Sequence, residues 1–302
     1  MRRPLGLLVQ SLVFVFLSSI LSSILFAQAM DLRVVSAAPT GEVAQLEEAN
    51  EIRVIFSEPM VTLGRIPSNP SPSWIHISPS IAGTYRWSGT TVLVFTPDPN
   101  TPLPYSTEYT VTIDRSAESS GGRTLVSPYV FSFTTPTVKL KSLRWFQRQN
   151  RFDQPVVLML EFNQRVRADA IAAHVHVRYQ RHDWDPPMAT ARERARMNVG
   201  DPTGAARFDA KVAAARQSAR RRDVVAVRPT TDWDRERYPE NAGLVALETV
   251  GPPAPGGWLE VTVDDQITGE SGIARPARAQ TSVVELAPVF FVQGVACSTG
   301  CD

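Results

Sequence analysis

The chain has 302 residues, of which 43% are hydrophobic and 20% charged, and its formal net charge is +1. This length suits two domains of ~100–200 residues each. The balanced charge argues against a protein that acts on nucleic acid through a strong overall field, so we expect no nucleic-acid partner. The 24 prolines outnumber the 17 glycines and separate short β-type runs, which favours β-sandwiches over helical bundles.

Residues 1–29 predict an export signal. Arg2 and Arg3 form a basic start, Leu5–Phe26 is apolar, and Ala27–Ala29 has the small-x-small pattern of a cleavage site after Ala29. The mature protein is then expected in the periplasm, secreted, or at the cell surface. The apolar run is longer than the ~7–15 residues of a usual signal core. An uncleaved anchor is therefore the alternative, and it would be the chain's only membrane contact.

Residues 30–136 predict a first β-sandwich. In Ile52–Phe56, apolar residues recur at every second position, as in a strand with one face on a core. Pro59 would end that strand, because proline has no N–H to donate. The turn residues Ser88 and Gly89 predict a hairpin. Further strands are expected at Leu32–Ser36, Trp74–Ser78, Thr84–Trp87, Thr91–Phe95 and Tyr129–Thr135.

The segment Pro102–Val111 carries the most specific local signal. Leu103 and Tyr109 lie six residues apart across a turn, as in the tyrosine corner of immunoglobulin-like sandwiches, where the tyrosine hydroxyl binds upstream backbone. Tyr109, Val111 and Ile113 would then face the core. About seven short strands predict an all-β, Ig-like sandwich.

Residues 137–288 predict a second β-sandwich after a brief linker at residues 136–141. The strand and turn of Ile52–Met60 return as Leu158–Val166, and Ile75–Ile77 returns as His174–Tyr179. Two landmarks that recur in the same order indicate an internal repeat. Strands are expected at residues 156–162, 174–179, 224–227, 244–247, 258–263 and 280–286. Residues 289–302 resemble the start of an incomplete third module.

An alanine- and arginine-rich insertion is expected at about residues 183–223. Phe208, Val212, Ala215 and Ala219 recur at helical spacing, which predicts a helix of about four turns that ends near Arg222. Its cations could form a patch for nucleic acid or anionic lipid, or they could be a solvated face. The interspersed aspartates favour the solvated face.

Several of these sequence motifs, taken together, resemble those of a known protein family. The turn after Phe56, the Gly83–Trp87 hairpin, the tyrosine corner and Phe133–Pro136 between the modules look like the amino-terminal part of bacterial alpha-2-macroglobulin-like proteins. That resemblance implies a scaffold segment of a large periplasmic or surface protein that traps proteases, its expected partners. The family's thioester motif is Cys-x-x-Gln, which neither Cys297 nor Cys301 begins.

The resemblance therefore leads us to expect an amino-terminal fragment without the thioester region. The alternative is a cell-surface adhesion or cell-wall protein that uses Ig-like modules as spacers. Cys297 and Cys301 are the only cysteines, so the body should fold without disulfides. They could pair with each other or with cysteines outside this sequence.

We expect no enzyme, cofactor or metal site. His174 and His176 share a strand face but lack a third ligand. Ser271 lacks the second glycine of a nucleophile elbow. Trp184 and Trp233 leave open a carbohydrate-binding role. The acidic runs lack the spacing of a calcium loop, and they lie at Asp183–Asp185, Asp232–Asp234 and Asp264–Asp265.

Overall fold

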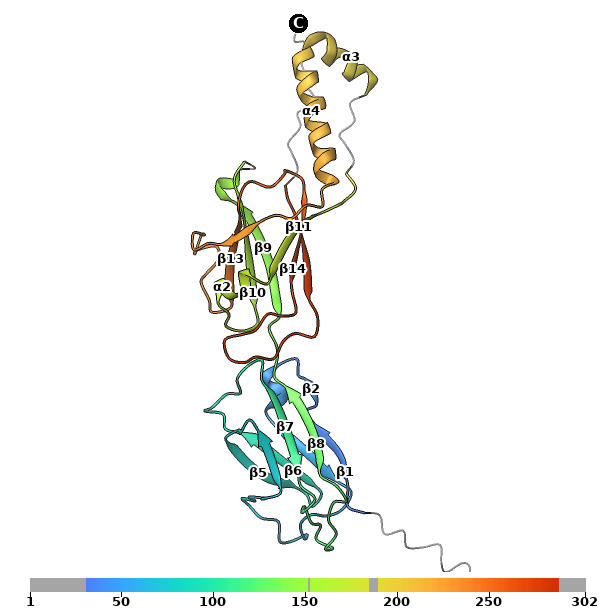
Figure 1. Cartoon of the computed structure of the whole chain (residues 1–302), viewed down its shortest axis with the longest axis vertical. Coiled ribbons are helices and arrows are strands. Elements are labelled where there is room, and N and C mark those ends of the chain that lie inside the picture. The colour runs from blue at the N-terminus through green and yellow to red at the C-terminus, as the bar shows by residue number, and fades with distance from the viewer. Residues whose placement is uncertain (1–30, 152, 185–189, 288–302) are drawn as a thin grey trace, which may run out of the picture. The chain divides into compact units, whose positions relative to one another are not determined.

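The structure is a computed structural model that describes residues 31–287, except residues 152 and 185–189 (Figure 1). The predicted cleavage site at Ala29, the cysteines Cys297 and Cys301 and the predicted third module lie outside the described residues. The chain divides into two compact units. One comprises Met1–Pro39, Glu51–Pro99 and Thr110–Phe131, and the other comprises Thr40–Asn50, Asn100–Tyr109 and Ser132–Asp302.

Residues 34–134 form the two sheets of the first sandwich. The β2–β8 pair is parallel, whereas β1–β3, β3–β6, β5–β6 and β4–β7 are antiparallel. A short 3₁₀ helix, Leu46–Ala49, precedes β3. In spatial order, one sheet contains β1 (Val34–Ala38), β3 (Ile52–Phe56), β6 (Val92–Pro97) and β5 (Gly83–Ser88), and the other contains β2 (Gly41–Glu42), β8 (Tyr129–Thr134), β7 (Glu108–Ile113) and β4 (Ile75–Ser78).

The alternation in the sequence places the core residues of this sandwich. In β3 every second residue is buried, beginning at Ile52, because successive side chains of a strand point to opposite faces. The same period buries Tyr109, Val111 and Ile113 in β7, which confirms the predicted core face. Gly89 makes the turn of the predicted hairpin with a φ of +73°, a conformation that glycine adopts without strain.

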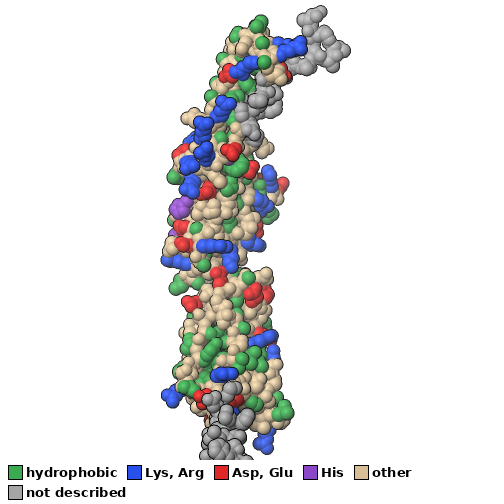
Figure 2. Space-filling model, turned by 90° about the vertical axis from the view of Figure 1, so that its right-hand side faces the viewer, with side chains coloured by type: hydrophobic (Ala, Val, Ile, Leu, Met, Phe, Trp, Pro, Cys, Tyr) green, Lys and Arg blue, Asp and Glu red, His purple; other side chains and the backbone are tan. Residues whose placement is uncertain are grey.

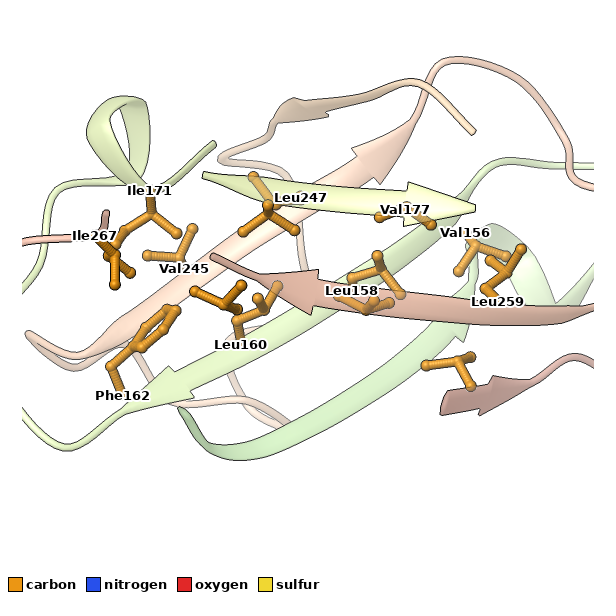
Figure 3. Packing of buried hydrophobic residues seen from close by; sticks show 14 of the residues in the cluster. Val156, Leu158, Leu160, Phe162, Ile171, Val177, Val245, Leu247, Leu259 and Ile267 are labelled. Carbon is orange, nitrogen blue, oxygen red and sulfur yellow. The ribbon is translucent and has the colours of Figure 1, made fainter. Parts of the chain in front are cut away.

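The second sandwich also has two sheets, and its core lies between them (Figure 3). Leu158 and Leu160 of one sheet pack with Val177 and Leu259 of the other, all at most 2% exposed. Burial of such a side chain stabilises the fold by about 1.5–3 kcal/mol. One sheet contains β12 (Val227–Pro229), β13 (Leu244–Thr249), β10 (Val156–Phe162) and β9 (Leu140–Gln147), and the other contains β11 (Val175–Gln180), β14 (Trp258–Val263) and β15 (Gln280–Glu285).

The two sandwiches repeat the same strand order. The sheet β1-β3-β6-β5 of the first corresponds to β9-β10-β13-β12 of the second, and β4-β7-β8 corresponds to β11-β14-β15. The register repeats as well, because Ile75 pairs with Ile113 in the first sandwich and Val175 pairs with Val263 in the second. The sequence repeat is therefore a repeat of topology.

Three features of the second sandwich differ from the expectations. β9 begins at Leu140, inside the predicted linker. Its polar and apolar residues do not alternate strictly, so the sequence pattern did not predict a strand there. The expected strand at 224–227 is wrong, because Val224 makes only an isolated bridge to Arg178 and β12 begins at Val227. Two helices were not predicted, a short α2 (Ala168–Ala172) and α3 (Ala191–Gly200).

The predicted helix of the insertion is confirmed, with a small difference in its length and end. It exists as α4 (Pro202–Ala219), with 18 residues, or about five turns, and it ends before Arg222. Together α3 and α4 form a helical hairpin, residues 190–222, within the predicted insertion. The hairpin lies in the β11–β12 connection, residues 181–226, whereas the equivalent β4–β5 connection of the first sandwich needs only residues 79–82.

Candidate functional site

The turn that follows β10 is fixed by its polar side chains. Asn163 Oδ1 accepts a hydrogen bond from Lys139 N (2.8 Å), and Asn163 N donates to Lys139 O (3.0 Å). In the first sandwich, Ser57 makes the same pair of bonds with Arg33 N (3.1 Å) and Arg33 O (2.9 Å). This residue therefore ties the turn to the segment that leads into the first strand of its sandwich.

Gln164 and Ser106 form a buried polar pair within the second unit. Gln164 is 6% exposed, and its Nε2 donates to Ser106 Oγ (3.0 Å) and to Pro136 O (3.3 Å). Ser106 N also donates to Pro136 O (3.1 Å), and Ser106 O accepts from Ala274 N (2.8 Å). We call these residues the polar junction. Because its buried polar groups are paired, loss of one partner leaves another without a hydrogen bond.

The predicted linker beside the junction is also well bonded. Val138 is fully buried. Glu42 Oε1 accepts from Thr137 N (3.1 Å), Thr137 Oγ1 (2.8 Å) and Lys139 Nζ (3.0 Å). Burial by itself would raise the pKa of the Glu42 carboxyl, but these bonds from Lys139 and Thr137 outweigh it and lower the pKa.

The predicted tyrosine corner brings Tyr109 into the core, where it stacks on Phe133 with ring centroids 5.2 Å apart. The side-chain hydrogen bonds at this corner come from Thr107 and Thr135, and Thr107 Oγ1 donates to Tyr105 O (3.0 Å). Thr135 Oγ1 donates to Pro104 O (2.8 Å) and accepts from Thr107 N (2.9 Å). The corner therefore contributes packing and backbone bonding, and it exposes no reactive group.

Each sandwich carries a histidine–aspartate pair at the same place. His76 Nε2 lies 3.0 Å from Asp114 Oδ2, and His176 Nε2 lies 3.2 Å from Asp264 Oδ2. His174 Nδ1 joins the second pair, 3.0 Å from Asp264 Oδ1. Each aspartate directly follows its strand, β7 or β14. The sequence singled out His174 and His176, but their shared partner appears only in the fold.

The imidazoles of His174 and His176 are thus directed at a carboxylate. In the part of the chain that the structure describes, no group of three or more His, Cys, Asp and Glu side chains could hold a metal ion. Burial alone would raise the pKa of Asp264, but bonds from Gln266 N, His176 and His174 outweigh it and lower the pKa. The Asp264 carboxylate therefore connects the end of β14 to the start of β11 through the two histidines.

Asp264→Asn is expected to lower the free energy of unfolding by about 1 kcal/mol at neutral pH, because the charged acceptor is lost. Since the folded pKa lies below the ordinary 3.8, the contribution is present above pH 3.8 and disappears as pH falls through the folded pKa. Urea unfolding of both proteins across this range measures it. Asp265→Asn is the control, and an equal loss in the control would contradict the assignment.

Glu248 of β13 is the centre of a charged network. Arg148 Nη2 and Arg228 Nη2 each lie 2.7 Å from its carboxylate, on opposite oxygens. Arg148 also pairs with Asp232 Oδ2 (2.6 Å) and donates to Thr230 Oγ1 (3.2 Å). Burial would raise the pKa of Glu248, but the two arginines outweigh it and lower the pKa. The sequence does not reveal this network, because its members come from separate strands and loops.

The remaining sequence candidates are occupied in turns or packing. Trp233 donates from Nε1 to Tyr238 O (3.0 Å), and Arg235 covers its ring at 4.6 Å, so it does not present a free platform for a sugar. Asp234 Oδ1 accepts from two backbone N–H groups within its own turn. Ser271 is exposed in a bend, and Trp184 is half-buried.

The hairpin is built by two helix caps that follow each other closely. Thr190 and Glu193 form a capping box, in which Glu193 N donates to Thr190 Oγ1 (3.2 Å) and Thr190 N donates to Glu193 Oε2 (2.7 Å). Asp201 caps α4 by accepting from Gly204 N (2.8 Å), and Pro202 occupies the first turn. The Thr-x-x-Glu pattern was the signal that could have revealed α3.

The end of α4 is attached to the second sandwich. Ser218 Oγ donates to Pro255 O (3.3 Å), and His182 N donates to Ala219 O (3.0 Å). The Arg221 guanidinium lies over the Tyr179 ring at 4.1 Å. Figure 2 shows Arg and Lys side chains gathered over the hairpin and the adjoining part of the second sandwich. No helix in the described residues is both long and apolar enough to cross a bilayer.

Comparison with known proteins gives a family match for the first sandwich. Residues 29–135 match the model of the bacterial Ig-like domain, a non-catalytic type of module. The chain therefore contains a bacterial Ig-like domain in a mostly β fold with a helical insertion. A search of the curated proteins found no match.

Three solved structures show distant similarity. The first is native alpha-2-macroglobulin from Escherichia coli spanning domains MG0-NIE-MG1, with 13% identity over 85% of this chain and 72% of that one and a TM-score of 0.26. The LD transpeptidase LdtMt1 in complex with imipenem has 13% identity over 54% and 66%, TM-score 0.22. An L,D-transpeptidase from Mycobacterium tuberculosis H37Rv has 13% identity over 52% and 69%, TM-score 0.22. At these scores the similarities carry no argument.

Proposed function

We propose that this chain is a non-enzymatic, extracytoplasmic scaffold segment of an alpha-2-macroglobulin-like protease-inhibitor protein. The observation that carries the proposal is the repeated strand order, with the same polar tie at Ser57 and Asn163. A repeat of one module type along a chain suits a structural array better than a single active site. The Ig-like match at residues 29–135 supports a structural role for the first module.

The order of sequence landmarks supports the specific parent protein. The turn after β3, the β5–β6 hairpin, the corner before β7 and Phe133–Pro136 between the sandwiches follow the pattern of that family's amino-terminal part. In such a protein these modules would position a bait region and a thioester domain carried elsewhere. The basic start and apolar run of residues 1–29 support export.

Two experiments test the proposal. The gene is sequenced past the codon for Asp302, where we expect further Ig-like modules and a Cys-x-x-Gln motif in the same frame. A wall anchor or surface-layer repeat there would replace the protease-trap role with the adhesion-spacer role.

Cell fractionation tests the proposed export. The full chain should accumulate outside the cytoplasm, and the chain without residues 1–29 should remain inside, whereas cytoplasmic accumulation of both would refute export.

A further inference from the structure

We propose that the helical hairpin, residues 190–222, is a docking surface for anionic phospholipid membranes. The hairpin is an addition to the fold, because the first sandwich closes the equivalent connection with residues 79–82 alone. The two helices are separated only by Asp201, and both are capped. The insertion is therefore a folded element, and the sandwich topology does not require it.

Its charge differs in sign from that of the rest of the protein. Residues 191–222 contain nine Arg and Lys residues against three acidic residues, a net charge of +6, so the other residues together carry −5 of the chain's +1. In a chain of nearly zero net charge, such local asymmetry favours an anionic partner for the basic part. The small net charge of the whole chain conceals this asymmetry.

Most of these cations are available to a partner. Arg194 pairs with Asp209, and Arg221 pairs with Asp223. Among the described residues, the other seven make no ion pair, and all seven are exposed: Arg192, Arg196, Arg207, Lys211, Arg216, Arg220 and Arg222. Solvated charges of this kind gain by approaching phosphates, because they break no internal pair in doing so.

The side chains of the hairpin favour lipid phosphate over nucleic acid. Eight of the nine cations are arginines, whose planar guanidinium binds phosphate through two parallel hydrogen bonds. The only aromatic residue of the hairpin, Phe208, is 7% exposed, so it offers no stacking platform for bases. Val199, near the bend between the helices, is 87% exposed and can enter the headgroup region.

The biological setting of this proposal rests on the export proposed above, but its test does not. The purified full chain is floated with vesicles of phosphatidylglycerol mixed with phosphatidylcholine, and with vesicles of phosphatidylcholine alone. We expect stronger binding to the anionic vesicles, and we expect that excess to disappear as salt screens it. Equal binding to both vesicles at low salt would refute the proposal and leave the export proposal untouched.

A charge-reversal variant separates the hairpin from the apolar amino terminus. Arg207 and Lys211 lie one turn apart on α4, and both are exposed. The double variant R207E/K211E should bind the anionic vesicles at least about tenfold more weakly, since each lost cation costs about fivefold. The control R65E/R115E makes the same charge change at exposed positions of the other unit and should bind like the unmodified protein.

Four outcomes would overturn the proposal. If R207E/K211E and R65E/R115E lose vesicle binding equally, only the total charge matters. If neither variant loses binding, the amino terminus is responsible for it. Either result refutes the proposal. Tighter binding to duplex DNA than to vesicles at equal phosphate concentration would also refute it. Competition by inorganic phosphate at the concentration of lipid phosphate would indicate a site for the free ion instead of a membrane. Unchanged thermal unfolding midpoints confirm that the variants are folded.

Discussion

Replacement of Glu248 by Gln is expected to lower the free energy of unfolding of the second unit by about 2–3 kcal/mol. The carboxylate is 9% exposed and accepts from two guanidinium groups, Arg148 and Arg228. A glutamine keeps the shape but removes the charge, and its amide group turns N–H towards one of the arginines. Arg148, itself only 22% exposed, is then left partly buried beside a weaker acceptor. Urea unfolding measured by fluorescence gives the difference.

The control for this experiment is Asp232→Asn, which removes the exposed partner of the same arginine. Asp232 is 84% exposed, so its loss should cost less than about 1 kcal/mol. The pH dependence adds a second check. Because the folded pKa of Glu248 lies below the ordinary 4.5, its contribution is complete above pH 4.5 and is lost as pH falls through the folded pKa. The E248Q deficit should therefore shrink in acid, and a pH-independent deficit would refute the charge explanation.

Gly272→Ala is expected to destabilise the polar junction by about 2–3 kcal/mol, through overpacking against backbone. A Cβ at this position would overlap Ser106 O and lie 2.5 Å from Tyr105 O. Neither atom can rotate away, since both belong to the main chain. Relief requires the loop to move, which breaks the hydrogen bond from Ala274 N to Ser106 O. Thermal unfolding should show the loss.

Gly251→Ala is the matched control, because nothing lies within 4 Å of the added Cβ. It should change stability by no more than about 0.5 kcal/mol. Hydrogen exchange at the Ala274 amide distinguishes local from global effects. The exchange should accelerate in G272A and stay unchanged in G251A. If G272A unfolds like the unmodified protein and protects Ala274 equally, the loop does not rest on residues 105–106 as the structure indicates.

Local signals in the sequence were sufficient where burial follows a short period. Ile52–Phe56 and Glu108–Ile113 were placed correctly because one face of each strand is buried, so the apolar residues alternate. The β9 strand lacks that alternation, so its first residues resemble a linker in the sequence. The helix α3 has no buried residue, so the apolar-spacing criterion had no pattern to find there.

The candidate sites were less predictable than the fold. His174 and His176, and the basic run after Thr190, can be singled out from the sequence, because they are recognisable by residue type alone. Their partners were not visible. Asp264 is 88 residues from His176, and Ser106 is 58 residues from Gln164. Such pairs depend on strand register and on turns, which local sequence patterns do not determine.

The sequence by itself therefore determined the class of module, its repetition and the presence of a basic helical insertion. Each of these follows from a local pattern. The patterns are, in the same order, a two-residue period of apolar residues, a recurring sequence motif and apolar residues at helical spacing. Only the tertiary structure decided what the polar residues do. It gave Asn163 and Gln164 structural bonds and gathered Arg148 and Arg228 on Glu248. Within the described part of the chain, it left most cations of the hairpin without an ion pair. The physical reason is that these hydrogen bonds and ion pairs join residues distant in sequence. Periodic burial, in contrast, leaves a pattern of apolar residues within a single strand or helix.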